Sequence, residues 1–107
     1  MPALPANVIE LCQALVRIPS VNPDGDPGTP HVGEHACAEF VGEFLRASGA
    51  EVFLDEVEHG RPNVIGRFPT LPSADGRQKP RIVFGPHTDT VSVGGMTIDP
   101  FGGEVRD

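Results

Sequence analysis

Several residue types are scarce in this sequence, and each scarcity excludes a class of protein. It contains no Trp or Tyr, only two Cys, and no apolar run near the ~18 residues that a membrane-spanning helix requires. The first residues, Met1-Pro2-Ala3-Leu4-Pro5, lack the basic and apolar regions of a signal peptide. Cys12 and Cys37 show no Cys-x-x-Cys spacing, so we expect two free thiols buried on helices. These features predict a cytoplasmic protein without disulfides.

Basic residues are also few. Eight Lys and Arg stand against fifteen Asp and Glu, and the formal net charge is −7. This balance argues against binding to a nucleic-acid backbone or to an anionic membrane. The 107 residues have room for one small domain or for part of a larger one.

The first half of the chain carries two helical patterns. Apolar residues recur at spacings of three and four from Ala6 to Arg17, which predicts an amphipathic helix. A second helix is expected to start with Thr29 as its cap and Pro30 at its first position, and to stop at Ser48-Gly49. The turn formers from Ser20 to Gly28 predict a surface loop between the two helices.

After the second helix the apolar period changes to two, which is typical of strands. Glu51–Val57 and Asn63–Phe68 predict a hairpin, and Arg81–Phe84 predicts a third strand. The glycine-rich segment Ser92–Asp107 has no periodic pattern, so we expect it to be loose. The order of the elements favours a layered α/β unit.

The strongest chemical signal follows the third expected strand. In an extended segment alternate side chains share a side, so His87 and Asp89 would point into one pocket while Thr88 faces away. A neutral imidazole binds zinc through one ring nitrogen and commonly donates its other N–H to a carboxylate. The spacing therefore predicts His87 as a metal ligand and Asp89 as the carboxylate that orients it.

The chain also resembles, in order and spacing of its motifs, the amino-terminal part of one enzyme family. This family is the zinc-dependent exopeptidases and deacylases, which include acetylornithine deacetylase, succinyl-diaminopimelate desuccinylase, carboxypeptidase G and aminoacylase. The segments that carry the resemblance are Leu15–Pro23, Leu45–Gly49, Arg61–Val64, Gly85–Val91 and Asp99–Phe101.

The resemblance implies that residues 1–107 form the amino-terminal part of a three-layer αβα catalytic domain. It implies a hydrolase with two zinc ions, or cobalt or manganese in their place, that cleaves amide bonds in N-acyl amino acids or small peptides. His87 would bind one zinc, Asp89 would tune its basicity, and a glutamate would relay the proton. A homodimer is compatible with the family.

The sequence departs from the family pattern in three respects. Gly85-Pro86-His87 replaces the commoner Gly-His, and Met96 stands where an aromatic residue is more usual. The later metal ligands and the inserted dimerisation domain of the family are missing. Since a catalytic zinc takes about three protein ligands, we expect a truncated chain that is inactive alone.

Two other functions compete with this one. His31, Glu34 and His35 match the His-x-x-Glu-His pattern of inverzincin proteases, in which two histidines on one helix face bind zinc. We expected instead that His31 lies exposed in the first turn of the second helix, near the positive end of its dipole, and that Glu34 belongs to a solvated acidic face. The other alternative is a degenerate, non-catalytic binding module, which a stop codon directly after Asp107 would favour.

Overall fold

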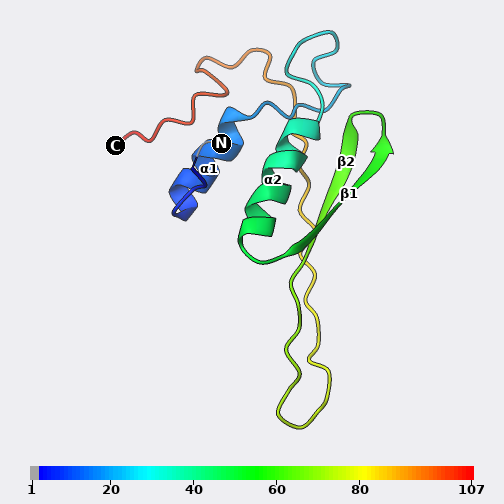
Figure 1. Ribbon diagram of the computed structural model, residues 1–107. Helices are drawn as coiled ribbons and strands as arrows, with labels where there is room; N and C mark the ends of the chain where they lie inside the picture. The colour runs from blue at the N-terminus through cyan, green and yellow to red at the C-terminus, as the bar shows by residue number, and fades with distance from the viewer. Residues whose placement is uncertain (1–2) are drawn as a thin grey trace.

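The computed structural model describes residues 3–107 and shows a small mixed α/β unit (Figure 1). Its elements follow in the order α1 (Val8–Arg17), α2 (His35–Ala47), β1 (Glu51–Glu58) and β2 (Arg61–Arg67). Over residues 3–107, no helix combines the length and the apolar character needed to cross a membrane.

β1 and β2 form the expected antiparallel hairpin, with Leu54 opposite Val64. The turn is tighter than predicted, because Gly60 adopts a positive φ of 75° and the second strand begins at Arg61. α2 packs across one face of this hairpin. A Cβ atom on Gly42 would lie 3.3 Å from Val52, so the missing side chain permits this close approach.

α2 begins later than the sequence predicted. The expected cap at Thr29 is wrong, because the helix starts at His35. Gly33, two residues before this start, has a φ of +100°. Instead of winding into a helix, the preceding segment pairs with Val21, and the Gly33 N–H donates to the Val21 carbonyl at 2.9 Å. Pairing of this segment with Val21 therefore prevents the helix from starting at the cap that the local sequence predicts.

Three segments that are distant in the sequence meet at Val21, whose side chain is fully buried. Val21 forms parallel bridges to Val32 on one side and to Thr90 on the other. The Val21 N–H donates to the His31 carbonyl at 3.0 Å. We call this arrangement, made of residues 20–22, 31–33 and 90, the Val21 junction.

The third predicted strand, Arg81–Phe84, is wrong within the described residues. The segment is extended, but no backbone hydrogen bond joins it to another part of residues 3–107. Ile82, Val83 and Phe84 are 81%, 88% and 85% exposed. A strand needs a neighbouring strand that pairs with its backbone hydrogen-bonding groups. Residues 68–88 form an extended arm that protrudes from the rest of the molecule, here called the body, and no such neighbour lies beside it among the described residues (Figure 1).

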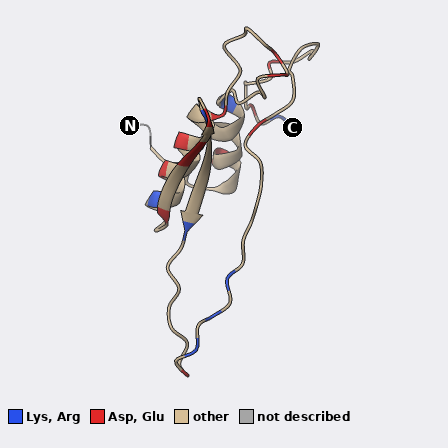
Figure 2. Cartoon of the chain, turned by 90° about the vertical axis from the view of Figure 1, so that its right-hand side faces the viewer, with Lys and Arg blue, Asp and Glu red and all other residues tan. Residues whose placement is uncertain are grey.

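The arm and the body differ in charge. Basic residues lie along the arm at Arg77, Lys79 and Arg81, with Asp75 as its acidic residue, whereas acidic residues gather on α2 and the hairpin (Figure 2). The body is consequently more acidic than the average of the whole chain.

The segment after Thr90 contains no helix or strand, as expected, but it is not loose. The Gln13 side chain donates to the Gly103 carbonyl at 2.8 Å, and Arg17 Nε donates to the Gly102 carbonyl at 3.1 Å. At the other end, the Asp26 carboxylate accepts from the Val93 N–H at 3.0 Å and from the Ser92 hydroxyl. Polar contacts to α1 and to the loop after it therefore hold this segment, which periodicity cannot predict.

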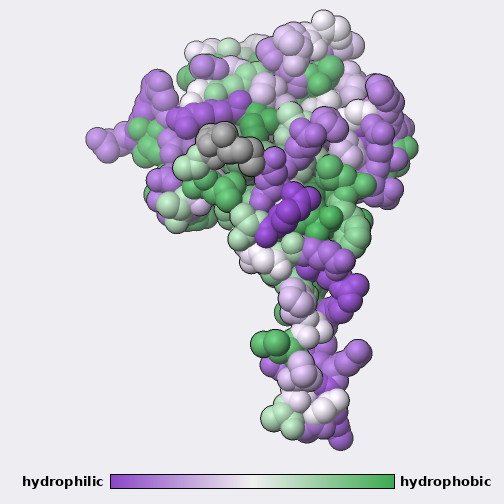
Figure 3. Space-filling view, viewed as in Figure 1, coloured by the Kyte–Doolittle hydropathy of each residue, from purple (hydrophilic) through white to green (hydrophobic). Residues whose placement is uncertain are grey.

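The expected burial of the two cysteines holds for one of them. Cys37 is buried in α2, whereas Cys12 is exposed on α1. α1 has no buried residue, and its apolar side chains include Val8 at 77% and Ile9 at 58% exposure. Hydrophobic surface is accordingly open on the body of the molecule (Figure 3). The amphipathic pattern identified the helix correctly but says nothing of whether its apolar face is covered.

This difference predicts unequal thiol reactivity. We expect iodoacetamide to label Cys12 readily in the native protein and Cys37 slowly, because burial raises the pKa of the Cys37 thiol and blocks access to it. Mass spectrometry of Cys12→Ser and Cys37→Ser variants measures each thiol separately. Denaturant should equalise the two rates, and equal rates in the native protein would contradict the structure.

The Val21 junction predicts a stability effect. Val21→Ala removes two buried methyl groups, and we expect it to lower the free energy of unfolding by about 2 kcal/mol. Urea denaturation followed by circular dichroism measures the change. Val57→Ala is the matched control, since Val57 is 66% exposed and its truncation should change stability by less than about 0.5 kcal/mol. Equal effects of the two substitutions would rule out the junction as a stabilising element.

The contacts of Asp26 predict an acid-dependent release of the segment that follows Thr90. Hydrogen bonds from Ser92 and Val93 lower the pKa of Asp26. Because the folded-state pKa is the lower one, this contribution is present above the ordinary Asp pKa of about 4 and is lost as the pH falls through the lowered value. We expect the Val93 amide resonance to titrate below about pH 4 in the wild type and not in Asp26→Asn. Asp24→Asn, in the same loop, should titrate like the wild type.

Candidate functional site

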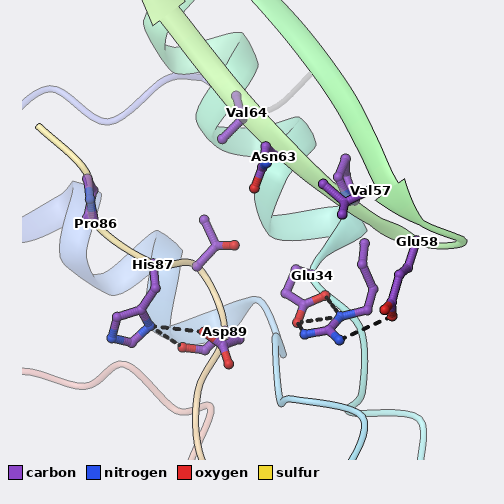
Figure 4. Close-up of a pocket in the computed structure, with 11 residues that line it drawn as sticks. Glu34, Val57, Glu58, Asn63, Val64, Pro86, His87 and Asp89 are labelled. Carbon is purple, nitrogen blue, oxygen red and sulfur yellow. Dashed lines mark hydrogen bonds and ion pairs between the residues drawn. The ribbon is translucent and has the colours of Figure 1, made fainter. Parts of the chain in front are cut away.

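His87 and Asp89 lie against each other at the base of the arm. His87 Nδ1 is 3.1 Å from Asp89 Oδ1 and 2.8 Å from the Asp89 carbonyl oxygen (Figure 4). The imidazole is 85% exposed and the Asp89 side chain 34%. Within the described residues, Nε2 of His87 makes no hydrogen bond. In this arrangement Nδ1 faces two oxygen acceptors of Asp89, and Nε2 is available to a ligand.

The Asp89 carboxylate is itself held in place. Asn22 Nδ2 donates to Asp89 Oδ2 at 3.0 Å. The hydrogen bond from Asn22 lowers the pKa of Asp89, and the charge of His87 lowers it further. An ionised Asp89 can only accept hydrogen bonds, so it favours the His87 tautomer with the proton on Nδ1 and the lone pair on Nε2.

An open cavity of about 410 Å³ adjoins this pair. Its walls come from Pro86–Asp89, from Glu34 just before α2, and from the turn end of the hairpin at Val57, Glu58 and Arg61–Val64 (Figure 4). Thr88 also lines the cavity, contrary to the expectation that it faces away. The segment is not a pleated strand, so strict alternation of side chains does not apply to it.

An ion pair between a buried carboxylate and a half-buried guanidinium forms the opposite wall. The Glu34 side chain is 6% exposed and accepts from Arg61 Nε at 3.0 Å and from Arg61 Nη2 at 2.9 Å. Arg61 Nη1 lies 3.4 Å from Glu58 Oε2. The hydrogen bonds that Arg61 donates to Glu34 raise the pKa of Arg61. The expectation that Glu34 belongs to a solvated acidic face is therefore wrong: Arg61, on another element, compensates the buried charge.

The three residues of the inverzincin pattern do not form one site. His31 precedes α2, and its ring contacts that of Phe101 in a tilted arrangement, with centroids 5.0 Å apart and an angle of 50° between the ring planes. His35 Nε2 pairs with Glu39 at 3.0 Å on the exposed side of the helix. Glu34 is engaged by Arg61. The prediction that His31 lies in the first turn of the helix is wrong, and each residue has a separate partner.

The donor set fits one metal ligand and its orienting carboxylate. His87 offers Nε2, and Asp89 fixes the other ring nitrogen, as in the carboxylate–histidine–zinc arrangement. Over residues 3–107, no group of three or more His, Cys, Asp and Glu side chains is arranged to hold a metal ion. A site of the catalytic type takes about three protein ligands, so the described residues do not complete one.

Sequence reasoning missed two contributors to this region. Asn22 lies in a segment read as a surface loop, and Arg61 lies in a motif whose ionic partner was not identified. The available signal for Asn22 was its place in Ser20-Val21-Asn22-Pro23, one of the segments that carry the family resemblance. The contact to Asp89 joins residues 67 positions apart, which no local pattern reveals.

Comparison with known proteins gives no further assignment, since no family model and no solved structure matches this chain.

Proposed function

We propose that this chain is the amino-terminal part of the catalytic domain of a metal-dependent hydrolase, one that cleaves amide bonds in N-acyl amino acids or small peptides. The observation that supports it best is the His87–Asp89 pair, with Nδ1 3.1 Å from the carboxylate, beside an open cavity of about 410 Å³. A substrate of this class needs such a cavity next to the reacting groups.

In this proposal His87 binds the metal through Nε2. Asp89 accepts the Nδ1–H, which holds the ring in the required tautomer and increases the basicity of Nε2. A bound pair of zinc ions, with cobalt or manganese as alternatives, supplies Lewis-acid chemistry toward the amide carbonyl. Glu34 and Arg61 neutralise each other in the cavity wall and keep it in place.

The uncovered apolar surface supports a larger domain around these residues. Ile82, Val83 and Phe84 form a continuous apolar run, each more than four-fifths exposed, directly before the site. Such a run is typical of a strand buried on both faces in the sheet of an α/β protein. In the proposed three-layer domain, neighbouring strands and helices would cover this run and the apolar face of α1.

The proposal predicts that activity depends on His87. We expect the complete gene product that contains residues 1–107, loaded with zinc or cobalt, to hydrolyse members of a panel of N-acetyl amino acids and dipeptides. His87→Ala should reduce the rate to that of the metal blank, because it removes the Nε2 ligand. His35→Ala, which alters an exposed histidine paired with Glu39, is the matched control and should retain activity.

Two results would contradict the proposal. One is full activity of His87→Ala, and the other is the absence of hydrolysis across the panel with either metal. The 107-residue chain alone should show only the rate of the metal blank, since it supplies one of about three ligands.

A further inference from the structure

The Asn22 side chain makes hydrogen bonds through both its oxygen and its nitrogen at the candidate site. Its Oδ1 accepts from the Asp24 N–H at 3.0 Å, and its Nδ2 donates to Asp89 Oδ2 at 3.0 Å. The Asp24 N–H can only donate, so the oxygen of the amide must face it. The amide nitrogen is thereby directed at Asp89, and the reverse orientation would place oxygen against oxygen.

The backbone fixes Asn22 at the same place. The Asn22 N–H donates to the Thr90 carbonyl at 2.8 Å, and the Thr90 N–H donates to the Ser20 carbonyl at 2.9 Å. These two bonds form one side of the Val21 junction, next to Asp89 in the chain. The main chain of Asn22 is thus bonded to Thr90, the residue that follows Asp89, and its side chain is bonded to Asp89 itself.

The two oxygens of Asp89 consequently have different roles. Oδ2 accepts from Asn22, and Oδ1 lies 3.1 Å from His87 Nδ1. If the carboxylate rotated, the contact with Asn22 would be lost together with the contact with the imidazole. Asp89 is 34% exposed, so water competes for both oxygens and a fixed donor is needed to keep this rotamer.

We propose that Asn22 is a positioning residue of this site: through Oδ2 it holds the Asp89 carboxylate in the orientation that places Oδ1 against His87 and leaves Nε2 open to a metal ion. The metal part of this inference rests on the proposed function, whereas the orientation of His87 does not. The competing acceptor is the Asp89 carbonyl oxygen, 2.8 Å from Nδ1, which would select the same tautomer without help from Asn22.

Asn22→Ser separates the two roles of the side chain. A serine hydroxyl can still accept from the Asp24 N–H in an ST-turn, but it is too short to reach Asp89. Asn63→Ala is the matched control, because Asn63 lines the same cavity and makes no side-chain contact with Asp89 among the described residues. Both variants should keep the fold, which circular dichroism and the urea midpoint verify.

The experiment uses long-range ¹H–¹⁵N spectra of His87 in the metal-free chain, followed by titration with zinc chloride. At a pH at which the imidazole is neutral, we expect the wild type and Asn63→Ala to carry the His87 proton on Nδ1, and Asn22→Ser to show a mixture of both tautomers. Zinc should shift the His87 ring resonances at a concentration about 10- to 100-fold higher in Asn22→Ser than in the wild type.

The outcomes distinguish the two ideas. An unchanged tautomer and unchanged zinc dependence in Asn22→Ser would overturn the positioning role and assign the tautomer to the carbonyl of Asp89. A changed tautomer in a chain whose His87 does not respond to zinc still supports the positioning role, because that role does not require the metal, and the proposed metal function is then decided by the activity of His87→Ala in the complete gene product.

Discussion

The pairing of Val21 with two other segments is the interaction on which the site depends. Val21 is fully buried between Val32 and Thr90, and each of these belongs to a segment that would otherwise have no regular partner. Backbone hydrogen bonds of 2.8 to 3.0 Å close both sides. Because these bonds do not depend on side-chain identity, they hold the chain in place while leaving the side chains of Asn22 and Asp89 to meet. Loss of this pairing would separate the two.

The Glu34–Arg61 pair connects the junction to the hairpin. Glu34 follows Gly33, whose N–H bonds to Val21, and Arg61 is the first residue of β2. A buried carboxylate is unfavourable unless it is paired and hydrogen-bonded, and Arg61 satisfies both oxygens of Glu34. The pair therefore fixes the start of α2 against the hairpin, and the cavity lies between this wall and His87. The two walls come from separate segments of the chain.

Local patterns predicted the elements whose contacts are local. Helix periodicity found α1, the Ser48-Gly49 stop agrees with the end of α2, and the period of two found both strands of the hairpin. The predictions failed where contacts with a distant segment determine the local structure. Thr29 does not cap α2 because residues 31–33 pair with Val21, and Arg81–Phe84 forms no ladder because residues 3–107 offer it no neighbour. Cys12 is exposed for the same reason, since amphipathicity identifies an apolar face but not its cover.

The same difference holds in the candidate site: contacts between neighbouring residues were predicted, and contacts between distant residues were not. His87 and Asp89 were predicted together because they are two positions apart, and the structure does bring them into contact. The contacts of Asn22 and Glu34 were not predicted because their partners, Asp89 and Arg61, lie 67 and 27 positions away. Each of these distant contacts joins a carboxylate to a side chain that can only donate to it. The hydrogen bond from Asn22 lowers the pKa of Asp89, and this carboxylate lies beside an imidazole with one open nitrogen. A negative charge at this position favours a cation over an anion beside the imidazole.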